Sequence, residues 1–179
     1  MQLVVVTGIT SFDPSGWRLW HAGLQKFLPD INLHILRRLY FLPVSPWAQA
    51  RAREVIDEGV ALLQTEEPTI LIGYSLGGLI AKTMIQRSKD HQVKLLVTLG
   101  TPHRAMFGVQ RFIKNIGVPE SVHVPTFTYG GLQDRLVHAR HTHMDGAQTH
   151  TILNCNHRAY FRVPEIRERV IGDIIKFLR

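Results

Sequence analysis

The stretch GYSLGG at residues 73–78 decides the fold of this chain, because it stands between a strand pattern and a helix pattern. Residues 69–73 read TILIG and residues 79–87 read LIAKTMIQR, so the chain must turn sharply from strand to helix at Ser75. Glycines two residues to either side let the neighbouring backbone approach without Cβ clashes. The turn places the Ser75 hydroxyl at the carboxyl end of the sheet and at a helix N-terminus, where free N–H groups stabilise a developing negative charge. The motif therefore predicts a nucleophilic serine.

Two other interpretations fit parts of the same stretch. One is a glycine-rich turn with an incidental serine, and the flanking strand and helix favour catalysis over it. The other is a phosphate-binding loop, because Gly73 and Gly78 have the G-x-x-x-x-G spacing. That loop needs Lys-Ser or Lys-Thr next, whereas Leu79 and Ile80 follow, which excludes it.

Outward from this stretch, strand and helix patterns alternate along the chain. Apolar, β-branched runs predict strands at residues 3–7, 33–36, 69–73, 93–99, 124–129 and 149–154. Apolar residues at helical spacing predict helices at residues 15–28, 46–63, 76–87 and 164–178. This order predicts an α/β fold, with a mainly parallel central sheet flanked by helices, in a single domain over residues 1–179.

Residues 102–125 are the least regular region. Within it Val109, Phe112, Ile113 and Ile116 have helical spacing. The favoured interpretation is one more surface helix packed on the core. The alternative is a short cap over an active-site mouth, formed by residues 103–123.

A serine hydroxyl needs a general base and a carboxylate that orients the base. After a turn of this kind, the Asp or Glu comes first along the sequence and the His comes after it. His157 is the last of ten histidines and stands after the final predicted strand, where the base should emerge. An exposed loop histidine is the alternative. Asp134 follows a predicted strand, whereas Asp90 falls at a helix end on the opposite rim. We therefore predict Ser75, Asp134 and His157, with Asp145 as the second choice of acid.

An oxyanion intermediate needs two N–H donors. One should be the residue after the nucleophile, Leu76, and the other should follow the first strand. Gly8 lets the backbone come close there, so Ile9 is the candidate second donor. A hydroxyl of Thr10 or Ser11 is a weaker candidate.

These residues together resemble the small, lidless bacterial lipases and esterases of the α/β-hydrolase superfamily. The resemblance covers nearly the whole chain, and it rests on Gly8-Ile9, the stretch at residues 73–78, residues 97–103 (VTLGTPH), Asp134 and His157. It implies a minimal α/β-hydrolase fold, the triad and oxyanion donors named above, and hydrolysis of carboxylic esters without a cofactor. The alternatives are a thioesterase or acyltransferase with the same triad, and a non-catalytic binding module of this fold. Thr7-Gly8 replaces the usual His-Gly of the first strand, which leaves the substrate open.

Composition sets further limits. The net charge of +7 allows a nucleic-acid or anionic partner, but the basic residues are scattered, so a solvated basic surface and a small ester or lipid substrate are favoured. No run is long enough for a transmembrane segment, and no signal peptide is visible, so we expect a cytoplasmic protein, or a secreted one if a leader has been removed. His138, His141, His143 and His150 could supply metal ligands, but their loop context favours no metal. Cys155 is expected to be a small packed residue.

Overall fold

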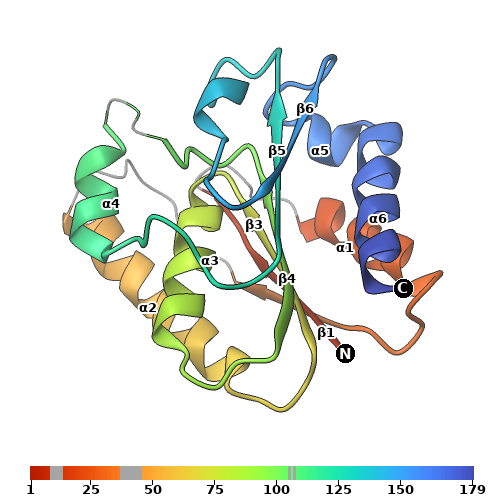
Figure 1. Ribbon diagram of the computed structural model, residues 1–179, viewed down its shortest axis with the longest axis horizontal. Helices are drawn as coiled ribbons and strands as arrows, with labels where there is room; N and C mark the ends of the chain where they lie inside the picture. The colour runs from red at the N-terminus through yellow and green to blue at the C-terminus, as the bar shows by residue number, and fades with distance from the viewer. Residues whose placement is uncertain (9–13, 37–45, 105, 107) are drawn as a thin grey trace.

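The computed structural model describes residues 1–8, 14–36, 46–104, 106 and 108–179, and it contains a six-stranded sheet between two layers of helices (Figure 1). The strands are β1 (Gln2–Val6), β2 (Asn32–Leu36), β3 (Thr69–Tyr74), β4 (Val93–Leu99), β5 (Thr126–Gly131) and β6 (Gln148–Ile152). Their spatial order is β2-β1-β3-β4-β5-β6, and every neighbouring pair is parallel. The predicted α/β fold with a parallel sheet is confirmed.

The helices are α1 (Pro14–Gln25), α2 (Pro46–Leu63), α3 (Leu76–Arg87), α4 (Gln110–Ile116), α5 (Ala159–Arg162) and α6 (Pro164–Leu178), with a short 3₁₀ helix, η1 (Ala139–His141). The helices α1, α5 and α6 cover one face of the sheet, and α2, α3 and α4 cover the other (Figure 1). The sequence analysis did not predict η1 or α5. Both have four residues or fewer, too few for a helical period to appear.

The central strands β1, β3 and β4 contribute side chains to both apolar layers, because successive side chains point to opposite faces of a sheet. Leu3 and Val5 of β1 pack with α1 and α6, while Val4 and Val6 pack with α2 and α3. Strands covered on both faces read as continuous apolar runs, and this explains the unbroken pattern of the sequence at residues 3–6.

Residues 110–116 form the surface helix that the spacing of their apolar residues predicts. Phe112 and Ile116 are buried in the layer that α2 and α3 also form. The Arg53 side chain on α2 donates a hydrogen bond of 3.4 Å to the Asn115 carbonyl. The helix α4 therefore packs on the protein's own core.

The direction of strand addition reverses between β1 and β3. The chain moves outward from β1 to β2, then returns to β3 on the other side of β1 and continues to β6. In parallel α/β sheets the crevice at such a reversal, outside the carboxyl ends of the strands, is where ligands bind. Gly8 follows β1 and Ser75 follows β3, so both lie at this point. Among the described residues, no helix is long and apolar enough to cross a membrane.

Candidate active site

The sharp turn at Ser75 has a strained backbone. Ser75 has φ 55° and ψ −129°, and it is the one non-glycine residue with positive φ in the described part of the chain. A Cβ at residue 73 would collide with the Gly78 backbone, and a Cβ at residue 77 would collide with the Val6 carbonyl. Only glycine therefore allows β1, β3 and α3 to approach one another this closely. A strained residue of this kind persists only where the surrounding structure fixes it, and such residues are common at functional sites.

The ends of two further strands hold Ser75 in place. The Ser75 N–H donates a hydrogen bond of 2.9 Å to the Leu99 carbonyl at the end of β4. Gly8 lies against it from the other side, where an added Cβ would be 2.6 Å from Ser75 Cβ and 3.2 Å from Ser75 Oγ. The serine is half-buried between these segments.

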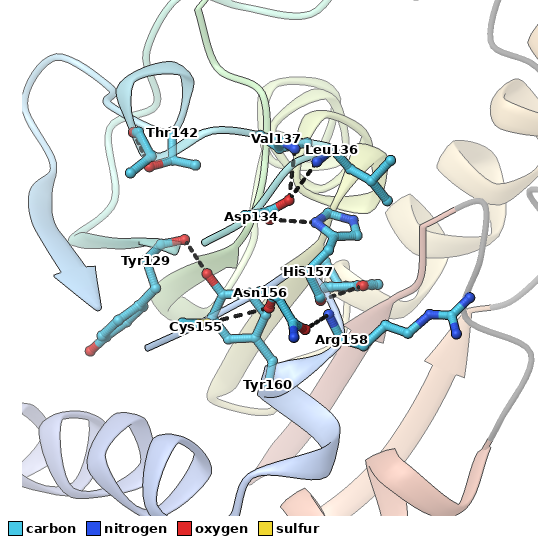
Figure 2. Close-up of polar contacts among 12 residues, drawn as sticks. Tyr129, Asp134, Leu136, Val137, Thr142, Cys155, Asn156, His157, Arg158 and Tyr160 are labelled. Atoms are coloured by element: carbon cyan, nitrogen blue, oxygen red, sulfur yellow. Dashed lines mark hydrogen bonds and ion pairs between the residues drawn. The ribbon is translucent and has the colours of Figure 1, made fainter. Parts of the chain in front are cut away.

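His157 and Asp134 form a buried pair (Figure 2). His157 Nδ1 lies 2.6 Å from Asp134 Oδ2, and the two residues are 6% and 1% exposed. The other carboxylate oxygen accepts hydrogen bonds from the N–H groups of Leu136, at 2.9 Å, and Val137, at 2.8 Å. These backbone donors fix the carboxylate, so it can orient the imidazole and stabilise its protonated form.

Two residues outside the predicted triad position His157. The Tyr74 hydroxyl donates a hydrogen bond of 2.7 Å to the His157 carbonyl, and the two rings lie 4.9 Å apart. Gly100 follows β4 with φ 55°, and a Cβ there would be 3.1 Å from His157 Nδ1 and 3.3 Å from Asp134 Oδ2. Both residues stood in motifs that the sequence singled out, but a contact between chain segments this far apart leaves no local signal.

Tyr74 also connects the pair to Ser75, which is the next residue along the chain. Among the described residues, no hydrogen bond joins Ser75 Oγ to His157. Such bonds are often long in free enzymes and tighten when substrate binds.

A sequence model of the family described as palmitoyl protein thioesterase matches residues 3–171. This chain belongs to that family. A comparison with curated protein sequences found no match.

Several solved structures have the same fold as this member of the thioesterase family. A protein described as a hydrolase of the alpha/beta superfamily, from Xanthomonas campestris pv. campestris, is 15% identical with a TM-score of 0.66, over 98% of each chain. An esterase from Exiguobacterium antarcticum is 12% identical with a TM-score of 0.68, over 98% of this chain and 92% of its own. A lipase-esterase related protein from Clostridium acetobutylicum is 14% identical with a TM-score of 0.62, over 98% and 93%. The α/β-hydrolase fold expected from the sequence is confirmed.

Of the two predicted oxyanion donors, Leu76 lies in the described part of the chain. Leu76 is the first residue of α3, and N–H groups in the first turn of a helix have no acceptor within the helix. Ile9 lies outside the described residues, as do Thr10 and Ser11. Gly8, the last described residue before Ile9, contacts Ser75.

Asp145, the second choice of acid, lies elsewhere in this thioesterase-family protein. Its carboxylate is 91% exposed, and it lies 3.3 Å from His143 Nε2 and 3.9 Å from an Arg104 nitrogen. Of these two carboxylates, Asp134 is therefore the one in contact with His157.

The histidine cluster divides among separate contacts. His138 accepts a hydrogen bond from the Arg140 N–H, and His141 accepts one from the Arg140 side chain. The His150 ring stacks on Tyr129, with centroids 4.6 Å apart. Within the described part of the chain, no three His, Cys, Asp or Glu side chains come together as a metal site.

Cys155 is fully buried beside the pair. Burial raises the pKa of its thiol to about 11, against the opposing effect of the hydrogen bond with Tyr160. The thiol is therefore protonated at neutral pH and is a poor nucleophile.

Proposed function

We propose that this chain is a serine hydrolase that cleaves carboxylic esters through an acyl-enzyme on Ser75. The observation that carries the proposal is the buried His157–Asp134 contact of 2.6 Å beside a strained serine. A nucleophile, a base and an orienting carboxylate in this relation are the components of acyl transfer.

The acylation step follows from these positions. The Ser75 hydroxyl attacks the ester carbonyl carbon while His157 Nε2 accepts its proton, and Asp134 stabilises the imidazolium. The Leu76 N–H, with that of Ile9 as the proposed second donor, stabilises the oxyanion. The imidazolium then gives its proton to the leaving oxygen, the carbon–oxygen bond breaks, and the acyl group stays on Ser75.

Deacylation repeats the same chemistry with water as the nucleophile. His157 removes a proton from the water, hydroxide adds to the acyl carbon, and the proton passes to Ser75 Oγ as the acid leaves. No cofactor is required by this cycle.

Thioesters are a second candidate class of substrate, and membership in the palmitoyl protein thioesterase family favours them. The same steps cleave a thioester, with sulfur in place of oxygen as the leaving atom. A thiolate leaves more easily than an alkoxide, so protonation by His157 is needed less in that case.

The test is hydrolysis of p-nitrophenyl esters and N-acetylcysteamine thioesters with acyl chains of graded length. We expect Ser75→Ala to lose activity by about 10³-fold or more, and the exposed Ser121→Ala to stay within about twofold of the wild type. A fluorophosphonate should label the wild type at Ser75, as the mass of the modified peptide would show. Retained activity or labelling in Ser75→Ala would refute the proposal.

A further inference from the structure

A hollow of about 1080 Å³ lies beside His157. It is lined by residues from the segment after β5, the segment after β6, helix α5 and the residue before α6, which are Leu132–Leu136, His138, Asn154, Asn156–Ala159, Arg162 and Val163. The hollow therefore adjoins His157, and Ser75 and Leu76 form no part of its described lining.

Three arginines give this hollow a positive charge. Arg135, Arg158 and Arg162 are exposed, and in the described part of the chain none of their guanidinium groups has an ion pair or a hydrogen bond. Figure 2 shows the Arg158 side chain extending away from the His157–Asp134 pair. Asp134 is the one carboxylate among the described lining residues, and it is 1% exposed and bonded to His157.

Unpaired guanidinium groups in a hollow are suited to an anion. Each presents several N–H donors in a planar fork that matches a phosphate or a carboxylate. The exposed side chains of Leu132 and Leu136 add an apolar wall beside them. A group that combines an apolar spacer with a terminal negative charge fits such a lining.

The chemistry at His157 decides which part of the substrate lies here. Under the proposed function, on which this inference rests, the imidazolium gives its proton to the leaving oxygen or sulfur. The leaving group must therefore start at His157, and the adjoining hollow is where it continues. We propose that the hollow binds the leaving group and that this group carries a phosphate or a carboxylate, held by Arg135, Arg158 and Arg162.

The test compares three butyryl thioesters that share the scissile bond and acyl chain. Their thiols are N-acetylcysteamine, which is neutral, 4′-phosphopantetheine, which carries a phosphate, and glutathione, which carries carboxylates. We expect kcat/KM for at least one charged thioester to exceed that of the neutral one by about tenfold at low salt, and less at high salt. The charged thioester with the higher kcat/KM shows which anion the arginines bind.

The variants then assign the preference to the hollow. We expect the ratio of charged to neutral kcat/KM to fall to about one in the triple variant Arg135→Gln/Arg158→Gln/Arg162→Gln. Lys94 is exposed near the amino-terminal end of β4, whereas the hollow lies beyond the carboxyl ends of the strands. Lys94→Gln removes one charge there and should keep the ratio within about twofold. An equal rate for all three thioesters in the wild type would overturn the inference, as would a ratio that survives in the triple variant.

A binding measurement separates this inference from the proposed function. If neither thioesters nor esters are hydrolysed, the proposed function fails. Calorimetric titration of Ser75→Ala with free 4′-phosphopantetheine and glutathione still tests the arginines. We expect one of them to bind, and about tenfold more weakly when the three arginines are replaced in a protein whose circular dichroism is unchanged. Absence of binding, or equal binding in both proteins, would refute an anion site.

Discussion

Ser75 holds a backbone conformation that serine rarely adopts, and this strain can be measured. Glycine adopts φ 55° readily, whereas alanine has the same Cβ penalty as serine. We expect Ser75→Gly to have a free energy of unfolding about 1 kcal/mol higher than Ser75→Ala, after the greater chain entropy of unfolded glycine is subtracted. Urea denaturation of both variants checks this. A Ser75→Gly protein no more stable than Ser75→Ala would show that the turn is relaxed.

Asp134 contacts Nδ1 of His157, and Asp134→Asn tests what this contact does with little change in the shape of the site. The Asn oxygen can still accept from the Leu136 and Val137 amides, so its NH₂ group faces His157 Nδ1. That nitrogen must then accept a hydrogen bond, which moves the proton to Nε2 and removes the lone pair that should face Ser75. We expect kcat to fall by about 10³- to 10⁴-fold with KM little changed.

The matched control for this carboxylate is Asp145→Asn. Asp145 is 91% exposed and pairs with His143 and Arg104, away from His157. Its replacement should leave kcat within about twofold of the wild type. A larger loss in Asp145→Asn than in Asp134→Asn would reassign the acid.

Two glycines at helices have opposite roles, and alanine substitutions separate them. Gly117 ends α4 with φ 68° and ψ 47°, while Gly172 lies inside α6, and an added Cβ meets nothing within 4 Å at either position. Only backbone conformation then decides the effect. We expect Gly117→Ala to lower the free energy of unfolding by about 1 kcal/mol, and Gly172→Ala to raise it by about 0.5–1 kcal/mol. Thermal and urea denaturation test both, and the same sign for both would contradict the argument.

Lys82 is a buried charge that links stability of the protein to pH. Its side chain crosses from α3 to the segment before β5, where Nζ donates a hydrogen bond of 2.8 Å to the Glu120 carbonyl. Burial lowers the pKa of Lys82 from 10.5 to about 8, against the opposing effect of the Glu120 charge. The ammonium form is therefore costly in the folded protein at neutral pH.

The sign of the pH dependence follows from this lowered pKa. Between pH 8 and pH 10.5 the unfolded chain binds more protons at Lys82 than the folded protein does, so stability rises with pH in this window. We expect the wild type to gain about 2 kcal/mol relative to Lys82→Met between pH 8 and pH 9.5, and Lys82→Met to be the more stable protein at pH 7. Urea denaturation at each pH measures this, with the exposed Lys94→Met as the control. A constant difference in stability across this pH window would show that folding does not lower the pKa of Lys82.

Local patterns of the sequence determined most of the architecture. Continuous apolar runs predicted the central strands β1, β3 and β4, and the glycines at residues 73–78 predicted the turn at Ser75, because both patterns are properties of short segments. The same patterns did not predict every end of the helices and strands. The last strand ends at Ile152 and not at residue 154, since hydrogen bonding across the sheet sets where a strand ends.

Contacts between distant segments were decided by the tertiary structure alone. Sequence order left both Asp134 and Asp145 as partners for His157, and only the packing of β5 beside β6 brings Asp134 Oδ2 to His157 Nδ1. The same is true of Tyr74 and Gly100 against His157, and of the three arginines around the hollow. The sequence predicts which residues lie at the carboxyl ends of strands. The partner of each side chain depends on the path of the connecting segments, and no local pattern of the sequence predicts that path.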